Sequence, residues 1–144
     1  MVEQRVELVP LKAYGDHRGK LLPLEAMSES VPFEIKRVYY MYDVPDRESR
    51  GAHAHVDLKQ ILICVNGGCT VVCDFGDGRP NETYRLDNPE RGLIIEGMVW
   101  REMLDWAPGT VLLVLADEHF SVAGPKEIRN HEDFVRRIKE AKCR

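Results

Sequence analysis

Short apolar segments of strand length recur along this chain, and clusters of glycine, proline and asparagine separate them. We predict strands at residues 34–44, 58–65, 70–75, 93–95, 99–104 and 110–115. Turn signals stand between several of them, at Asn66-Gly67-Gly68, Gly76-Asp77-Gly78-Arg79-Pro80, Asn88-Pro89 and Ala107-Pro108-Gly109. Many short strands at regular spacing are typical of a β-sandwich or barrel. Because 144 residues suffice for one core, we expect residues 1–144 to form a single all-β domain.

The C-terminal segment has a different pattern, in which apolar residues are spread among charges. Residues 126–142 carry Ile128, Phe134, Val135 and Ile138. This spacing predicts an amphipathic α-helix that begins at Asn130 or His131. We expect the helix to pack on the outside of the barrel and to have no catalytic role.

The overall charge excludes one class of partner and leaves another open. The formal net charge is −4 and no basic block is present, so we expect no nucleic acid partner. An acidic protein can still bind an anionic small molecule if a few arginines converge in its pocket.

Apolar runs and cysteines together predict a cytoplasmic protein with no membrane segment. The longest strongly apolar run, residues 111–116, is too short to cross a bilayer, and residues 1–10 lack the apolar core of a signal peptide. No Cys-x-x-Cys pair occurs, so we interpret the four cysteines as free, reduced thiols: Cys64, Cys69, Cys73 and Cys143.

The run Arg50-Gly51-Ala52-His53-Ala54-His55, followed by Lys59 and Gln60, carries the main chemical signal. Two histidines two residues apart project from the same side of an extended strand, because side chains alternate with period two. Such a pair binds a metal, transfers protons, or is merely a polar stripe on an exposed strand. Polar groups that border a strongly apolar strand favour a polar pocket inside the barrel.

The spacing from His53 to Gly67 resembles the first motif of the cupin superfamily, whose members are double-sheet jelly-roll barrels. Metal-binding cupins place Glu where Gln60 stands and supply a further His where Arg101 stands. Gln is a weaker, neutral ligand, and Arg cannot be deprotonated to bind a cation. We therefore expect no metal, which leaves the imidazoles free for acid–base work near neutral pH.

Several strings in collinear order resemble a narrower family, the nucleotide-sugar 3,4-ketoisomerases. They lie at residues 32–40, 50–60, 99–105, 111–116 and 128–130. The resemblance covers nearly the whole chain and implies a cofactor-free, homodimeric cupin with a C-terminal helix. It implies the substrate dTDP-4-keto-6-deoxyglucose, whose keto group moves from carbon 4 to carbon 3. The product would supply dTDP-linked 3-amino-3,6-dideoxysugars for bacterial surface glycans or natural products.

The resemblance also assigns roles to individual residues. His53 and His55 would act as base and acid, in an order that the sequence leaves open, and Tyr39 would give a hydroxyl to the enediolate or the sugar. Guanidinium and ammonium groups suit phosphate and sugar oxygens, and Gln60 is a further polar group in the matching string. The expected substrate-binding residues are therefore Arg18, Arg37, Arg50, Lys59, Gln60 and Arg101.

Two departures from the family pattern leave the product configuration open. Arg18 and Arg101 occupy positions at which relatives differ, and their combination matches neither product type. The product is therefore a 3-keto-6-deoxyglucose or a 3-keto-6-deoxygalactose. Phe120 stands where relatives often have Tyr, and we interpret it as structural.

Three alternative functions compete with the ketoisomerase. One is a 3,5-epimerase of the same nucleotide sugar, which also uses a His base and a Tyr acid in a metal-free barrel. Another is a noncatalytic cupin that binds a nucleotide sugar. The third is a metal-dependent dioxygenase, which Gln60 and Arg101 disfavour.

Overall fold

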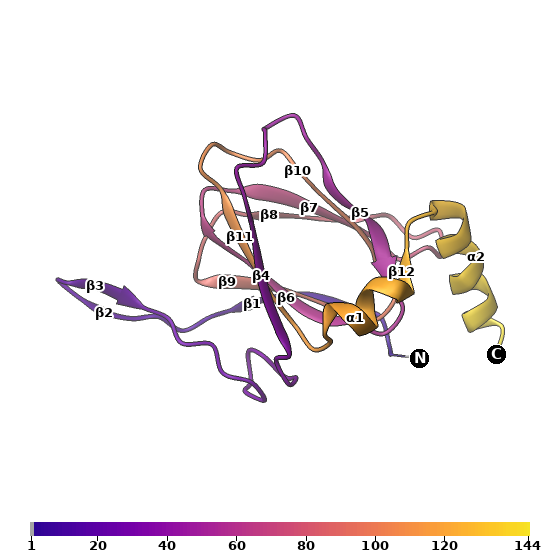
Figure 1. Ribbon diagram of the computed structural model, residues 1–144, viewed down its shortest axis with the longest axis horizontal. Coiled ribbons are helices and arrows are strands. Elements are labelled where there is room, and N and C mark those ends of the chain that lie inside the picture. Colours follow the sequence, from indigo (N-terminus) through magenta and orange to yellow (C-terminus); the bar gives the residue numbers. More distant parts are fainter. Residues whose placement is uncertain (1) are drawn as a thin grey trace.

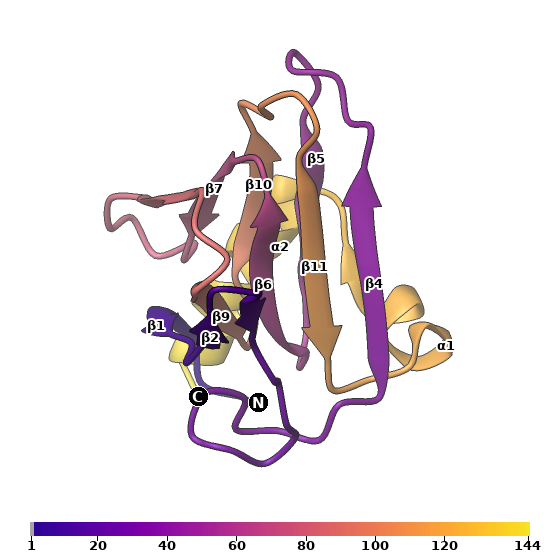
Figure 2. The ribbon, with the colours of Figure 1, turned by 90° about the vertical axis from the view of Figure 1, so that its left-hand side faces the viewer.

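The computed structural model describes residues 2–144, which form two five-stranded antiparallel sheets packed face to face (Figures 1 and 2). The first sheet has the order β1 (Arg5–Pro10), β9 (Arg91–Glu96), β6 (Lys59–Asn66), β11 (Val111–Ala116), β4 (Arg37–Tyr42). The second has the order β12 (Glu127–Ile128), β5 (Arg50–His55), β10 (Trp100–Leu104), β7 (Cys69–Asp74), β8 (Glu82–Leu86). The predicted all-β, double-sheet cupin barrel with a C-terminal helix is confirmed.

The six predicted strands correspond to β4, β6, β7, β9, β10 and β11, with ends displaced by a few residues. Strand β6 lies between β9 and β11 and is buried on both faces, as its apolar run predicts. One face packs into the barrel core with Leu62, and the other packs with Ile61 and Ile63 against the segment that contains Val31 and Phe33. The sequence reading did not identify β1, β2, β3, β8 or β12.

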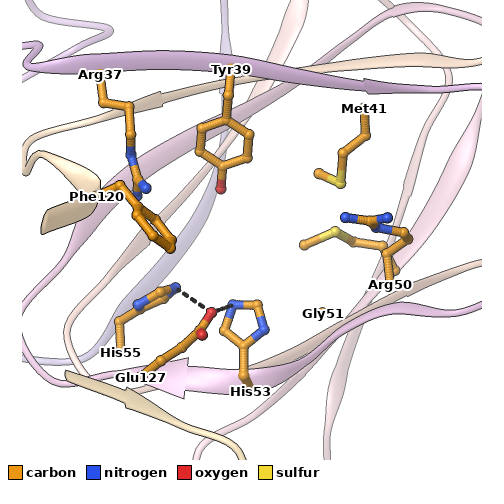
Figure 3. A pocket seen from close by; sticks show the side chains of 10 residues that line it. Arg37, Tyr39, Met41, Arg50, Gly51, His53, His55, Phe120 and Glu127 are labelled. Atoms are coloured by element: carbon orange, nitrogen blue, oxygen red, sulfur yellow. Dashed lines mark ion pairs between the residues drawn. The ribbon is translucent and has the colours of Figure 1, made fainter. Parts of the chain in front are cut away.

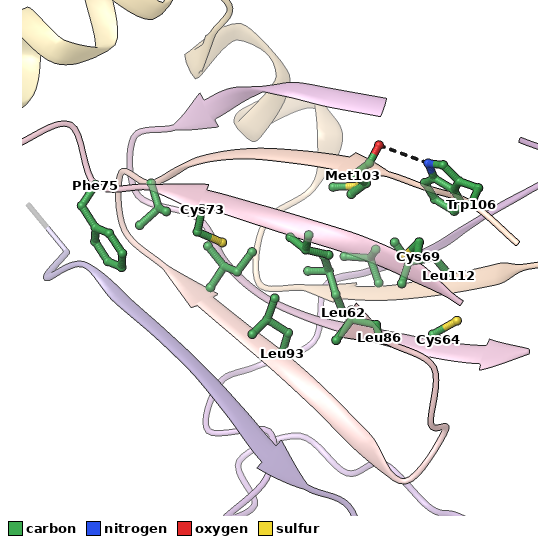
Figure 4. Packing of buried hydrophobic residues seen from close by; sticks show 14 residues of the cluster. Leu62, Cys64, Cys69, Cys73, Phe75, Leu86, Leu93, Met103, Trp106 and Leu112 are labelled. Carbon is green, nitrogen blue, oxygen red and sulfur yellow. Dashed lines mark hydrogen bonds between the residues drawn. The ribbon is translucent and has the colours of Figure 1, made fainter. Parts of the chain in front are cut away.

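The barrel core is filled by side chains from both sheets (Figure 4). Leu62, Leu93 and Leu112 come from the first sheet, and Cys73 and Met103 come from the second. Trp106 closes one end, where its indole Nε1 donates a hydrogen bond to the Met103 carbonyl at 3.1 Å. The apolar core thus occupies one part of the barrel interior and leaves another part for polar groups.

A hairpin of β2 (Tyr14–Asp16) and β3 (Gly19–Leu21) projects away from the barrel (Figure 1). Both of its strands are exposed along their whole length. Strand β4 is an edge strand, and its outward side chains Val38, Tyr40 and Tyr42 are exposed. The inward side chains of β4 face the barrel interior, as period-two alternation requires.

The C-terminal segment divides into more elements than the sequence predicted. Helix α1 (Phe120–Ala123) leads through a 3₁₀ turn (Gly124–Lys126) into the short strand β12, and only then does helix α2 (His131–Lys142) begin. The predicted start at Asn130 or His131 is confirmed, because the Asn130 side chain caps α2 by accepting a hydrogen bond from the Asp133 N–H at 2.9 Å.

Helix α2 lies on the outside of the barrel, as predicted (Figure 1). Its buried face consists of Phe134 and Ile138, which pack against Trp100 of β10. Within residues 2–144, no helix has the length and apolar character needed to cross a membrane.

Candidate active site

A cavity of about 340 Å³ opens between the edge strand β4 of the first sheet and β5 of the second (Figure 3). Both strands are rich in side chains that suit acid–base chemistry or anion binding. The lining residues are Arg37, Tyr39, Met41, Arg50, Gly51, His53, His55, Met103, Phe120 and Glu127.

The two histidines of β5 meet inside this cavity, as their spacing predicts. Their ring centroids lie 4.7 Å apart and the rings are nearly perpendicular. Upstream on β5, Gly51 allows the backbone to approach β10 closely, because its φ is +90° and a Cβ there would lie 2.9 Å from the Arg101 carbonyl oxygen. The register between β5 and β10 shifts at the same place, between Arg101 and Glu102.

Burial keeps both imidazoles uncharged near neutral pH. Desolvation, with the nearby positive charge of Arg101, lowers the pKa of His53. The same two causes, together with the neighbouring His53 and Arg37, lower the pKa of His55 to about 2. Both rings are therefore neutral before the substrate reacts, and a ring that takes up a proton from the substrate becomes an imidazolium that can donate it again.

Beside the cavity, Gln60 connects Tyr39 with Arg101 through buried hydrogen bonds. The Gln60 Nε2 donates to the Tyr39 hydroxyl oxygen at 2.9 Å, and Arg101 Nη1 donates to the Gln60 Oε1 at 2.6 Å. Arg101 also donates from Nε to the Val99 carbonyl at 3.0 Å. Gln60 and Arg101 are 2% and 1% exposed, and neither lines the cavity, so the structure places both behind its wall rather than at its surface.

Glu127 is a cavity residue that the sequence reading missed. Strand β12 pairs with β5 so that Glu127 lies opposite His55, and its Oε1 is 3.5 Å from His53 Nε2 and 4.0 Å from His55 Nε2 (Figure 3). Its Oε2 accepts hydrogen bonds from Arg129 Nη2 at 2.7 Å and Nε at 3.0 Å. The Gly124-Pro125 pair, which breaks a helix, was a signal that residue 127 precedes α2.

Metal ions in proteins are often held by histidine, cysteine, aspartate and glutamate. Within residues 2–144, one group of three such residues has its ligand atoms within 4.8 Å of one another: His53, His55 and Glu127. A divalent cation between them would lie near the permanent charge of Arg101, which already lowers the pKa of both histidines. An arginine cannot give up its proton and become a ligand. We therefore do not assign these residues as metal ligands.

Arg37 and Arg50 line the cavity, as predicted, and come from its two opposite strands. The Arg37 guanidinium lies over the Tyr39 ring at 5.0 Å and over the Phe120 ring at 5.7 Å. Phe120 is 66% exposed at the cavity, so it is a lining residue rather than the structural one that the sequence suggested.

Besides Gln60 and Arg101, two other predicted substrate-binding residues, Lys59 and Arg18, do not line the cavity of this chain. Lys59 begins β6 and pairs across to Glu96 of β9, on a different part of the sheet from the cavity. Arg18 lies on the projecting hairpin, where its exposed guanidinium forms an ion pair with Asp16 at 2.6 Å. The family resemblance predicted both residues, Lys59 as part of the string at residues 50–60 and Arg18 as a position at which relatives differ, but the strand direction and the hairpin place them away from the cavity.

The chain is similar in sequence and fold to a group of related proteins. The FdtA family model (WxcM-like, C-terminal) matches residues 4–139. A TDP-4-oxo-6-deoxy-alpha-D-glucose-3,4-oxoisomerase of Aneurinibacillus thermoaerophilus is 38% identical over 132 residues, which cover 92% of this chain and 91% of the relative.

Two solved structures have the same fold at similar identity. QdtA, a sugar 3,4-ketoisomerase from Thermoanaerobacterium thermosaccharolyticum crystallised with TDP, is similar with a TM-score of 0.87 and 38% identity, over 94% of this chain and 96% of QdtA. WlaRB, a TDP-quinovose 3,4-ketoisomerase from Campylobacter jejuni, is similar with a TM-score of 0.84 and 41% identity, over 91% of this chain and 97% of WlaRB.

Proposed function

This chain belongs to the FdtA family, whose relatives include sugar 3,4-ketoisomerases, and we propose that it moves the keto group of dTDP-4-keto-6-deoxyglucose from carbon 4 to carbon 3. The chain is an isomerase. The observation that carries the proposed reaction is a pair of buried imidazoles in a cavity flanked by Arg37 and Arg50. This arrangement combines proton transfer with binding of an anionic substrate.

The reaction needs a base, an acid and a stabilised enediol. Carbon 3 is alpha to the ketone, so its proton is acidic enough for one imidazole to remove it. The resulting enediol takes a proton at carbon 4, while a proton moves from the carbon 3 oxygen to the carbon 4 oxygen. His53 and His55 are our candidates for base and acid. No redox change occurs overall, so the reaction itself requires no external oxidant or reductant.

The substrate would extend from the histidines toward the cavity entrance. Arg37 and Arg50 are our candidates for the diphosphate, because a guanidinium donates two parallel hydrogen bonds to phosphate oxygens. Phe120 offers an exposed ring at the same cavity and is our candidate for the surface on which thymine stacks.

The experiment that tests this function is proton NMR of dTDP-4-keto-6-deoxyglucose incubated with metal-stripped protein in deuterated water. A 3-keto product with deuterium at carbon 4 is expected, and its coupling pattern gives the gluco or galacto configuration. Deuterium at carbons 3 and 5 without keto migration would instead identify a 3,5-epimerase. An unchanged spectrum despite measured binding would identify a noncatalytic binding protein.

We expect turnover without a metal, because Gln60 and Arg101 stand where metal-binding cupins carry ligands. Exhaustive treatment with a chelator should leave kcat unchanged, and elemental measurement should find no stoichiometric metal. One tightly held iron per chain, together with oxygen consumption, would contradict this and support a dioxygenase.

The carboxylate of Glu127 should influence the acid limb of the pH profile. Desolvation and Arg101 lower the pKa of His53 most, and Arg129 lowers it further, whereas a hydrogen bond with the Gly51 backbone and the negative charge of Glu127 raise it. Replacing Glu127 by Gln removes the negative charge and lowers that pKa further, so the acid limb of kcat/KM should move to lower pH. A weaker base also transfers protons more slowly, so the plateau should fall.

This prediction is checked by pH–rate profiles of the wild type and E127Q. Glu118→Gln is the control, because Glu118 pairs with Lys126 outside the cavity and its loss removes the same charge. Identical acid limbs for the wild type and E127Q would mean that Glu127 has no influence on the histidines.

We also propose that residues 1–144 act as a single domain within a homodimer. The family resemblance supports this assembly, and two exposed features are consistent with it: the projecting β2–β3 hairpin and the outward side chains Val38, Tyr40 and Tyr42 of β4. A second copy would also offer a route for Arg18 to reach a cavity. Light scattering of the purified protein should give twice the mass of one chain.

The cellular setting follows from the same family. We propose a cytoplasmic enzyme, since all four cysteines are free and three of them are buried. Its product would enter the synthesis of dTDP-3-amino-3,6-dideoxysugars for surface glycans.

A further inference from the structure

We propose that Arg101 and Gln60 are positioning residues that act through Tyr39, by fixing its hydroxyl so that its proton is donated into the cavity. This inference rests on the proposed function, because the group that would receive the proton is the oxygen of the enediolate. The donors and acceptors along the row of hydrogen bonds from Arg101 through Gln60 to Tyr39 determine where the Tyr39 proton points.

Arginine sets the direction of the whole chain of hydrogen bonds. A guanidinium has donors and no acceptor, so the atom of Gln60 that lies 2.6 Å from Arg101 Nη1 must be the amide oxygen. The other end of the amide, Nε2, therefore faces Tyr39 and donates to its oxygen at 2.9 Å. The Gln60 amide cannot rotate by half a turn without placing two donors against each other.

The Tyr39 hydroxyl has one proton to donate. Gln60 cannot accept it, because the atom of Gln60 that faces the hydroxyl is the donor Nε2. Within residues 2–144 the structure shows no other group that accepts the Tyr39 proton. Tyr39 lines the cavity and its hydroxyl points toward the histidine pair (Figure 3). The proton is thus directed at whatever oxygen a substrate presents there.

Burial makes this arrangement rigid. Gln60 and Arg101 are 2% and 1% exposed, and Arg101 is held from a second direction by its bond to the Val99 carbonyl. A donor that already points at the developing charge needs no reorganisation during the reaction, which is the basis of oxyanion stabilisation. Gln60 and Arg101 stand at the two positions where metal-binding cupins carry ligands, and in this chain they would orient the Tyr39 hydroxyl instead.

The decisive variant is Gln60→Glu, which keeps the size of the side chain and its bond to Arg101. A carboxylate beside Arg101 has only acceptors, so it would take the Tyr39 proton for itself and turn it away from the substrate. We expect Q60E to lose about as much kcat as Y39F, on the order of 100-fold. The double variant Y39F/Q60E should lose no more than Y39F alone, because the two substitutions remove the same hydrogen bond.

The outcomes separate this proposal from a structural role and from the proposed function. A purely structural Gln60 would tolerate the new ion pair, so an active Q60E with the kcat of the wild type would overturn the proposal, as would losses that multiply in the double variant. Affinity for TDP and the melting temperature are measured in parallel, and both should stay close to the wild-type values. A wild type that does not move the keto group would contradict the proposed function instead.

A second measurement needs no substrate. The side-chain amide proton signals of Gln60 in the wild type should shift when Tyr39 is replaced by Phe, because one of these protons loses its acceptor. Unchanged Gln60 signals in Y39F would show that the amide does not donate to Tyr39 and would overturn the proposal whatever the activity.

Discussion

Replacing His53 by Asn should lower kcat for keto migration by about 1,000-fold or more while the affinity for TDP stays within about threefold. A positioned acid or base contributes typically 10²- to 10⁴-fold to a rate, and Asn cannot accept a proton at any relevant pH. The arginines that are our candidates for the diphosphate, Arg37 and Arg50, are left in place. The loss should therefore fall on kcat rather than on binding, as a group used in the chemical step requires.

The measurement combines NMR turnover assays with calorimetric titration of TDP. His131→Asn is the matched control, since His131 lies on α2, where it pairs with Asp74 outside the cavity. H55N should behave like H53N if both imidazoles take part. An H53N protein that turns over at the wild-type rate would remove His53 from the mechanism, and equal loss of binding and turnover would identify a structural role.

The second large effect concerns stability. Phe134→Ala should lower the free energy of unfolding by about 3–5 kcal/mol, the usual result of removing a buried aromatic ring. Phe134 is fully buried, and its ring centroid lies 5.8 Å from that of Trp100. A cavity at this place would leave α2 without most of its contact with the barrel.

The same substitution should also disturb the active site. Phe134 belongs to a buried cluster that packs against the faces of β5 and β12 that point away from the cavity. Ala54 and Ile128 belong to that cluster, and they alternate along their strands with His53, His55 and Glu127, which face the cavity. We expect F134A to reduce kcat even where the protein remains folded.

Urea unfolding checks the stability, and the activity is measured at a temperature where the variant is folded. Val135→Ala is the control on the same helix, since Val135 is 37% exposed and its truncation should change stability by less than about 0.5 kcal/mol. An unfolding midpoint of F134A equal to that of V135A would mean that α2 does not support the barrel.

Local patterns determined most of the barrel and the centre of the site. The largely apolar β6, the turn at Asn66-Gly67-Gly68 and the cap at Asn130 depend on neighbours in the chain, so they could be identified from the sequence. The His53 and His55 pair follows from period-two alternation within one strand. The collinear family strings added Tyr39, Gln60 and Arg101 to the expected site.

Tertiary structure alone decided which distant residues share the cavity. Glu127 reaches the histidines because two residues of β12 pair with β5, a contact too short to leave a periodic pattern in the sequence. The family resemblance also suggested Lys59 and Arg18, yet the sheet and the hairpin place both residues away from the cavity. The hydrogen bonds from Arg101 through Gln60 to Tyr39 also join side chains from β10, β6 and β4, three strands that are not neighbours in either sheet. Sequence patterns report local periodicity, whereas these contacts depend on how strands far apart in the chain are paired and packed.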